Sequence, residues 1–149
     1  MCWCWARARW AGPWRRDGAA LASLLAQAEV VIKLLPLTVD TRGLLEANFF
    51  AAMPAQVALV NLARGAHVVD TDLLAALDSG HLRHAVLDVF DTEPLPAGHA
   101  CWQHPRVSLL PHAAAQTDPR SAAAVVVASL RALRDGAPLA HLVDRRRGY

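Results

Sequence analysis

Three residues have side chains suited to binding a carboxylate and to moving a proton: Arg64, Glu93 and His112. A guanidinium group such as that of Arg64 can hold a carboxylate through two parallel hydrogen bonds. The imidazole of His112, with an ordinary pKa of about 6.5, can protonate a carbonyl oxygen. The carboxylate of Glu93 can orient that ring and favour its charged form. Together they predict reduction of a 2-oxo acid, for which a cofactor must supply the hydride.

Each of the three residues also has a simpler interpretation when it is taken alone. An arginine before a glycine, such as Arg64, is usually a surface charge, and a Pro-His pair after a strand more often holds a capped or surface histidine. The Asp-x-Glu-Pro turn around Glu93 is more often a helix start or a solvated loop. The joint pattern favours catalysis, because each residue is expected at the carboxyl end of a strand in an α/β chain.

Short, largely apolar runs alternate with helical stretches, and this alternation predicts the fold. The expected strands are 29–35, 56–62, 84–90 and 106–110, and the expected helices are 19–28, 41–53, 71–79 and 121–134. We expect Asp17 and Asp70 as helix caps, and Pro54 and Gly80 as helix stops. Apolar strands of this kind are typical of a parallel sheet buried on both faces. The order predicts right-handed crossovers and an α/β, Rossmann-type doubly wound parallel sheet, in which ligands bind beyond the carboxyl ends of the strands.

The composition argues against several other classes of protein. Of the 149 residues 54% are hydrophobic and 19% charged, which predicts a globular chain. A net charge of +2 is too small to indicate a nucleic-acid partner. No run reaches the roughly 18 apolar residues of a membrane span, and the N-terminus lacks the pattern of a signal peptide. Three cysteines without a second ligand pair for Cys2 and Cys4 predict neither disulfides nor a metal site, as in a cytoplasmic protein.

Several motifs, in their order along the chain, resemble those of the D-isomer-specific 2-hydroxyacid dehydrogenases. They are NLARG at 61–65, DVFDTEPL at 88–95 and PH at 111–112, with LLAALDSG at 73–80 and WQHP at 102–105 between them. The bacterial glyoxylate/hydroxypyruvate reductase A type is the subgroup that the chain resembles most. That resemblance lies in LLPLT at 34–38, ARGAHVV at 63–69 and VDRRRGY at 143–149. The similarity runs through essentially the whole chain.

The resemblance implies roles that agree with the chemistry of the residues. Arg64 would bind the substrate carboxylate, Glu93 and His112 would form the acid–base pair, and Asp88 would lie near the nicotinamide ribose or ring. The residues expected to bind or border the cofactor at this edge are Leu35, Pro36, Thr38, Ala63, Arg64, Asp88 and His112. Trp102 would lie near the rim of the site, or serve as a core or interface anchor. We therefore expect a cytoplasmic, homodimeric enzyme that acts on small 2-oxo or 2-hydroxy acids without a metal.

The segment that precedes the first clear strand bears on the choice of cofactor. Residues 2–5 resemble the second strand of a dinucleotide fold, and Arg7 and Arg9 follow where an acid would bind the ribose hydroxyl of NAD. Arginines there can accept the 2′-phosphate of NADP instead. We expect NADP(H) to be preferred, with NAD(H) as the second choice and Arg7 and Arg9 as phosphate ligands. A basic N-terminal arm without this role is the alternative.

One part of the family pattern is missing, because the sequence contains no GxGxxG turn. That turn places backbone N–H groups and a helix N-terminus on the cofactor pyrophosphate. We therefore expect a dinucleotide-binding domain over 1–136 that lacks its first β–α unit. The segment 137–149 would return, in the family, to a substrate domain that is absent. Two functions stay open: a reductase of the glyoxylate/hydroxypyruvate type using NADPH, or a catalytically inactive remnant that at most dimerises or binds a nucleotide weakly.

Overall fold

The computed structural model of the chain describes residues 2–4, 9–10 and 18–144. The chain divides into two compact units, 1–114 and 115–149. The helix predicted over 121–134 therefore belongs to the second unit, whereas the sheet belongs to the first. The predicted domain boundary between 136 and 137 rests on the family pattern and stays a prediction.

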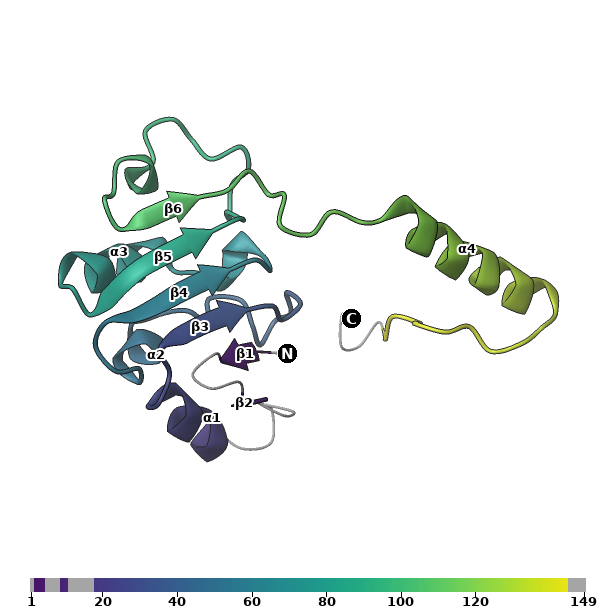
Figure 1. The fold of residues 1–149 in the computed structure, drawn as a ribbon, viewed down its shortest axis with the longest axis horizontal. Helices are drawn as coiled ribbons and strands as arrows, with labels where there is room; N and C mark the ends of the chain where they lie inside the picture. Colours follow the sequence, from purple (N-terminus) through teal and green to yellow (C-terminus); the bar gives the residue numbers. More distant parts are fainter. Residues whose placement is uncertain (1, 5–8, 11–17, 145–149) are drawn as a thin grey trace. The chain divides into compact units, whose positions relative to one another are not determined.

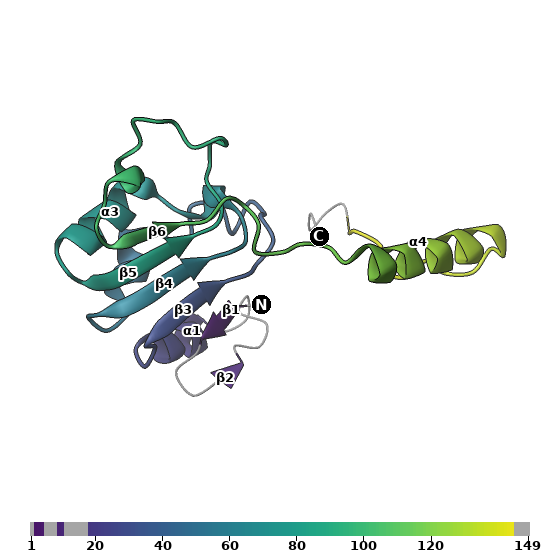
Figure 2. The ribbon, with the colours of Figure 1, turned by 45° about the horizontal axis from the view of Figure 1, so that its top comes forward.

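The first unit is built on a six-stranded sheet with the order β2-β1-β3-β4-β5-β6 (Figures 1 and 2). Its parallel part consists of β3 (Val30–Lys33), β4 (Val57–Asn61), β5 (Leu82–Leu87) and β6 (Val107–Leu109). Each of these strands lies within or overlaps a stretch that the sequence predicted. The prediction of a parallel, Rossmann-type sheet is confirmed for this part of the chain.

The N-terminal edge of the sheet differs from the parallel strand expected there. β1 (Cys2–Cys4) pairs antiparallel with β3, and β2 (Arg9–Trp10) pairs antiparallel with β1. Parallel neighbours need a crossover of a dozen or more residues, whereas a short connection such as that between β1 and β2 permits only antiparallel pairing. The two N-terminal strands therefore form a hairpin on the parallel sheet.

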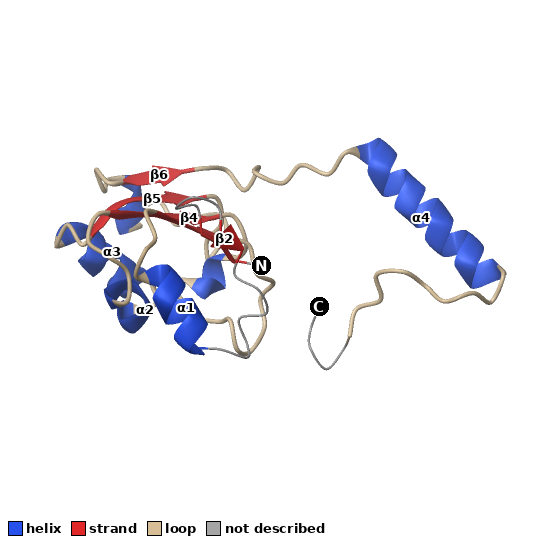
Figure 3. Ribbon diagram, turned by 60° about the horizontal axis from the view of Figure 1, so that its bottom comes forward, coloured by secondary structure: helices blue, strands red, loops and turns tan. Residues whose placement is uncertain are grey.

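The helices of the first unit lie on the same face of the sheet: α1 (Gly18–Leu25), α2 (Ala47–Ala51) and α3 (Asp70–Asp78) (Figure 3). Between these helices and the sheet lies the core, in which Leu59, Leu73 and Leu77 are fully buried. Strand residues that point to the other face, such as Ile32 and Val60, are only half-buried. The apolar strands predicted a sheet buried on both faces. In the first unit only one face is fully buried, because the described crossovers all pass on that side.

The helix predicted over 41–53 begins only at Ala47, so the first half of that prediction is wrong. Gly43 has a φ of +63°, and Leu45 forms an isolated parallel bridge with Val68. The chain from 41 to 45 is therefore held in a turn and a short extended segment. Glu46 then caps α2 by accepting the backbone N–H groups that follow it.

The limits of α3 agree more closely with the sequence. The helix begins at Asp70, with Val69 as its N-cap, so Asp70 belongs to the first turn rather than to the cap. The carboxylate is favourable there, because the N-terminal turn of a helix carries a partial positive charge. Gly80 follows the C-cap with a φ of +76°, as predicted for a helix stop. Asp17, the predicted cap of α1, lies outside the described residues.

The second unit contains α4 (Pro119–Arg134). Asp118 caps it by accepting the N–H groups of Arg120 and Ser121 at 3.3 and 3.0 Å, and these bonds lower the pKa of the Asp118 carboxyl. None of its residues is buried, and large apolar side chains such as Leu130 and Leu133 are exposed. In the described parts of the chain, no helix combines the length and apolar character that crossing a membrane requires.

Candidate active site

The predicted catalytic residues all follow the carboxyl ends of neighbouring parallel strands. Arg64 comes shortly after β4, Glu93 lies in the loop after β5, and His112 comes shortly after β6. The strand expected over 84–90 ends already at Leu87, which frees Asp88 and Phe90 for this loop. Because parallel strands end at the same edge, the sheet brings the three loops together at the edge where such folds bind ligands.

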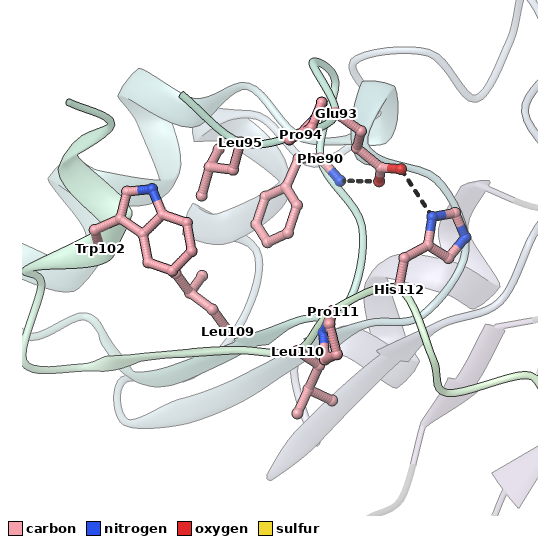
Figure 4. Close-up of a pocket in the computed structure, with 9 residues that line it drawn as sticks. All are labelled: Phe90, Glu93, Pro94, Leu95, Trp102, Leu109, Leu110, Pro111 and His112. Carbon is pink, nitrogen blue, oxygen red and sulfur yellow. Dashed lines mark hydrogen bonds and ion pairs between the residues drawn. The ribbon is translucent and has the colours of Figure 1, made fainter. Parts of the chain in front are cut away.

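Glu93 and His112 are in direct contact (Figure 4). Nδ1 of His112 lies 2.8 Å from Oε2 of Glu93, and Oε1 of Glu93 accepts the Phe90 N–H at 2.9 Å. The bond from Phe90, followed by that from His112, holds the pKa of the Glu93 carboxyl below its ordinary value. Glu93 is therefore an ionised acceptor, and Nδ1 of His112 must carry the proton that is shared with it.

This bond leaves the second ring nitrogen of His112 for a ligand. The His112 side chain is 50% exposed. Across the described part of the chain, no residue hydrogen-bonds to its Nε2. When the ring is charged, Nε2 can donate a proton, and when the ring is neutral, Nε2 can accept one. Because Glu93 holds the ring through Nδ1 and Nε2 faces away from that bond, the arrangement is that of a proton-transfer pair.

Asp88 holds the backbone that carries this imidazole. Its side chain is 1% exposed and accepts the N–H groups of Ala113 and Ala114 at 2.9 and 3.0 Å. These two residues follow His112, whose φ of +53° lies in the left-handed region that costs free energy for a side chain of this kind. Sequence reasoning placed Asp88 beside the nicotinamide, which stays a prediction, and missed this backbone contact. An acid directly after a buried strand was the signal that could have indicated it.

Arg64 is exposed after the end of β4, and its side chain makes no hydrogen bond or ion pair with Glu93 or His112. Its Nη1 donates to the Ala63 carbonyl at 2.6 Å. Buried Asn61 shapes the loop, because its side chain accepts the Ala63 N–H at 3.1 Å and donates to the Arg64 carbonyl at 3.0 Å. Sequence reasoning missed Asn61, although an asparagine at a strand end is a common signal for a side-chain-stabilised turn.

Gly65 brings the Arg64 loop against the loop that carries Glu93. A Cβ atom placed on Gly65 would overlap the backbone of Phe90 and Asp91. Only glycine allows two stretches of backbone to approach this closely. The Phe90 amide in turn donates to Glu93 at 2.9 Å. Arg64 is therefore connected to the proton-transfer pair through backbone contacts rather than through side chains.

The residues expected to border a cofactor lie at the ends of β3 and β4. Leu35 and Ala63 are buried, Pro36 is exposed and Thr38 is half-buried. Arg7 lies outside the described residues, and Arg9 is described only as part of the β2 backbone. No group of three or more metal-ligating side chains occurs among the described residues.

A pocket of about 620 Å³ opens beside the proton-transfer pair (Figure 4). Its lining is mostly apolar and consists of Phe90, Glu93, Pro94, Leu95, Trp102, Leu109, Leu110, Pro111 and His112. Trp102 is 54% exposed, and its indole N–H donates to the Pro96 carbonyl at 2.9 Å. Trp102 is therefore a wall of this pocket rather than a core residue. The carboxylate and imidazole form the polar end of the pocket.

Comparison with known proteins agrees with this geometry. Residues 14–114 match the family model of the D-isomer-specific 2-hydroxyacid dehydrogenase, NAD-binding domain. A D-isomer-specific 2-hydroxyacid dehydrogenase from Xanthobacter autotrophicus Py2, solved with NADPH and MES, is 45% identical with a TM-score of 0.84; the match covers 87% of this chain and 54% of that one. An NADPH-dependent glyoxylate/hydroxypyruvate reductase from Sinorhizobium meliloti, solved with NADP and sulfate, is 38% identical with a TM-score of 0.84, over 89% and 44% of the two chains.

A third solved structure, a D-isomer-specific 2-hydroxyacid dehydrogenase family protein from Klebsiella pneumoniae 342, is 44% identical with a TM-score of 0.78. That match covers 85% of this chain and 41% of the other. This chain spans about half the length of the solved structures that it matches. The family model covers well over half of the chain, and the resemblance stated from the motifs is confirmed. The chain belongs to the D-isomer-specific 2-hydroxyacid dehydrogenase family, through its NAD-binding domain.

Proposed function

We propose that this chain is the cofactor-binding and proton-transferring part of an enzyme that reduces a small 2-oxo acid with NADPH. The observation that carries the proposal is the Glu93–His112 contact of 2.8 Å at the carboxyl edge of a parallel sheet. Glyoxylate and hydroxypyruvate are the proposed substrates, because the reductase from Sinorhizobium meliloti is named for them. Each would be converted to the corresponding 2-hydroxy acid.

Each residue of the site has one task in the proposed reaction. Arg64 would bind the substrate carboxylate through its exposed guanidinium group. Charged His112 would donate its Nε2 proton to the carbonyl oxygen, which becomes the hydroxyl of the product. Glu93 would accept the hydrogen bond from Nδ1 and so hold the ring in place for the transfer. NADPH, when bound, supplies the hydride that the carbonyl carbon accepts.

The residues at the ends of β3 and β4 fit the nicotinamide half of such a cofactor. Pro36 is exposed and Thr38 half-buried, at the same edge as His112, while buried Leu35 and Ala63 would contribute through the shape of the backbone. Two of the similar structures were solved with NADPH or NADP, which supports NADP(H) over NAD(H). Assembly of the whole enzyme as a homodimer is part of the proposal.

Turnover by the 149-residue chain tests the proposal directly. The chain is incubated with NADPH and glyoxylate or hydroxypyruvate, and the loss of NADPH absorbance is followed. We expect His112→Ala and Glu93→Gln to lower the rate by about 10²–10⁴-fold, the usual contribution of an acid–base group. His104→Ala is the matched control. Nε2 of His104 lies 3.2 Å from the carboxylate of Asp78, but His104 precedes the amino end of β6, whereas His112 follows its carboxyl end. Parent rates no higher than those of His112→Ala would favour the inactive remnant for the isolated chain.

Cofactor preference needs a separate experiment, in which binding of NADPH and NADH to the chain is measured by fluorescence. Arg7 and Arg9 are the proposed ligands of the 2′-phosphate, which only NADPH carries. Replacing both arginines with serine should weaken the binding of NADPH far more than the binding of NADH. Equal weakening of the two cofactors would contradict the phosphate role and favour a basic N-terminal arm.

A further inference from the structure

A buried histidine lies beneath the site and has no task in the reaction proposed above. His67 ends the short 3₁₀ turn η2 (Gly65–His67) and has no exposed surface. Its Nε2 lies 3.3 Å from the carbonyl oxygen of Pro36, in the loop after β3. Burying a polar ring costs free energy unless its hydrogen bonds are made, so an apolar side chain would fill the same space at a lower cost.

The contact with Pro36 assigns the proton of the ring. A carbonyl oxygen only accepts hydrogen bonds, so Nε2 must be the protonated nitrogen. Burial, followed by the positive charge of Lys33, lowers the pKa of His67 to about 4, and the ring is neutral at physiological pH. Nδ1 is then unprotonated and buried, and none of the residues that the structure describes has hydrogen-bond geometry to it, although the backbone of Arg64, like that of Pro36, raises the pKa of the ring. The bond to Pro36 is what this buried ring gains.

The Pro36 carbonyl belongs to a closed turn at the end of β3. The same oxygen accepts the hydroxyl proton of Thr41 at 2.8 Å, and Oγ1 of Thr41 accepts the Thr38 N–H at 2.7 Å. Thr41 is 1% exposed, so both bonds are protected from water. The turn that contains Pro36 and Thr38, which we propose to border the cofactor, is therefore held as one piece.

The backbone of His67 belongs to the loop of Arg64. The His67 N–H donates to the Arg64 carbonyl at 3.3 Å, and Asn61 donates to the same oxygen at 3.0 Å. The His67 carbonyl accepts the Leu45 N–H at 2.8 Å, which anchors the other side of η2. One residue therefore combines a backbone fixed in the Arg64 loop with a ring bonded to the Pro36 turn.

We infer that His67 is a positioning residue, which couples the Pro36 turn on the cofactor side to the Arg64 loop on the substrate side. The inference rests on the proposed function for its kinetic consequence, but the coupling itself is a property of the fold. His67 touches neither substrate nor cofactor in this assignment. It sets the distance between two loops that must hold the two reactants in one geometry.

Two variants separate the hydrogen bond from the packing of the ring. His67→Leu fills similar space and removes the donor, whereas His67→Gln keeps an N–H donor at about the reach of Nε2. Amide hydrogen exchange is measured over 36–41 and 64–68 in the full chain. In His67→Leu, exchange of both segments should rise together by roughly tenfold, the equivalent of one lost hydrogen bond. His67→Gln should remain near the parent protein.

The matched control is His81→Leu. His81 also places Nε2 on a backbone carbonyl, that of Phe50 at 2.8 Å, but the bond ties the start of β5 to α2. Its loss should leave exchange over 36–41 and 64–68 unchanged. If exchange in His67→Leu rises in only one of the two segments, or in neither, the coupling is refuted. An equal effect of leucine and glutamine would show that the ring acts by shape alone, which also overturns the inference.

Kinetics then distinguish this inference from the proposed function. In a chain that turns over, His67→Leu should raise KM for glyoxylate and for NADPH by roughly tenfold each with a smaller change in kcat, and His67→Gln should restore both. Turnover with unchanged KM values would refute the positioning role alone. Absence of turnover in the parent protein, with exchange of the two segments still coupled, would refute the proposed function alone.

The parent protein gives a measurement that does not depend on whether the variants fold. ¹⁵N NMR of the histidine rings reports which nitrogen carries the proton. We expect a neutral His67 with a protonated Nε2 that exchanges slowly with water. A ring protonated at Nδ1, or one charged at physiological pH, would contradict the bond to Pro36 and with it the coupling.

Discussion

At the scale of single residues, the site depends on two carboxylates that hold the backbone and the ring of His112 in position. Asp88 uses its carboxylate on two backbone N–H groups, and Glu93 divides its two oxygens between the Phe90 amide and the His112 ring. Neither acid is left to act alone. The position of the His112 ring is therefore fixed by hydrogen bonds within the fold itself.

Asp88→Asn should destabilise the protein and reduce its activity. Asparagine has one acceptor oxygen, so its NH₂ group would face one of the two N–H donors at Ala113 and Ala114. Leaving a buried donor unpaired costs about 1–3 kcal/mol in free energy of unfolding, measured by urea denaturation. Asp91→Asn, at an exposed position of the same loop, is the control and should change little. Equal stability of the two variants would argue against the clamp.

The lowered pKa of Glu93 gives a second prediction at this scale. The ordinary pKa of this carboxyl is 4.5, and the hydrogen bond from the Phe90 amide is the largest single cause of its lowering, followed by the hydrogen bond from His112. Titration of the Glu93 carboxyl by ¹³C NMR should give a value below 4.5 in the parent protein. His112→Ala should raise the pKa of Glu93 only part of the way to its ordinary value, because the Phe90 bond remains. A full return to the ordinary value would show that the histidine alone sets it.

At the scale of secondary structure, the loops are held by close backbone contacts and by their strand ends. Gly65→Ala should separate the Arg64 loop from the Phe90 backbone, because the added Cβ would overlap atoms that cannot rotate away. We expect a loss of about 1–3 kcal/mol in free energy of unfolding and a rise in KM for the 2-oxo acid. Gly98→Ala is the matched control, since a Cβ there meets no atom within 4 Å. Similar behaviour of the two variants would refute the close approach.

The elements also show what the sequence could predict. Four parallel strands follow from apolar runs, and the candidate catalytic residues were chosen because they come just after those runs. The start of the helix predicted over 41–53 could not be found locally, because Leu45 pairs with Val68 from a distant part of the chain. The roles of Asp88 and Gly65 were missed for the same reason. Their partners lie in other loops, which only the fold brings into contact.

At the scale of the whole molecule, His67 makes stability depend on pH. Its pKa is lowered from 6.5 to about 4 by burial and by the charge of Lys33, while hydrogen bonding to the backbone of Pro36 and Arg64 opposes the shift. Between these values the unfolded chain binds more protons than the folded one. Stability should therefore be unaffected by this group above pH 6.5 and should fall as the pH drops toward 4.

By pH 4 this group should lower the free energy of unfolding by about 3 kcal/mol, because its pKa falls from 6.5 to about 4 and a pKa difference of 1 corresponds to about 1.36 kcal/mol. Urea denaturation at several pH values, compared between the parent and His67→Gln, isolates this part because glutamine does not titrate. The stability difference between the two proteins should change across this window and be constant above it. Parallel curves for the two proteins would show that the buried ring does not resist protonation.

At this scale too, some features of the fold could be predicted from the sequence and others could not. The parallel sheet and its family were predictable, because apolar strands and strand-end motifs are local patterns. It was not predictable that the helices of the first unit would cover only one face of the sheet. Ile32 and Val60, which point to the other face, are as apolar as the strand residues in the core. Which residues hold the cofactor phosphate stays a prediction, since Arg7 lies outside the described residues and only the backbone of Arg9 is described.

The clamp made by Asp88 has a consequence for how this sequence can vary. It uses only the N–H groups of Ala113 and Ala114, and every amino acid except proline presents the same donor. Ala113 and Ala114 can therefore be replaced by most other residues without disturbing the neighbouring imidazole of His112. A proline at either position would remove a donor outright. The fold thus allows substitutions directly after His112. Asp88 itself, 25 residues before Ala113 and at the end of another strand, allows almost none.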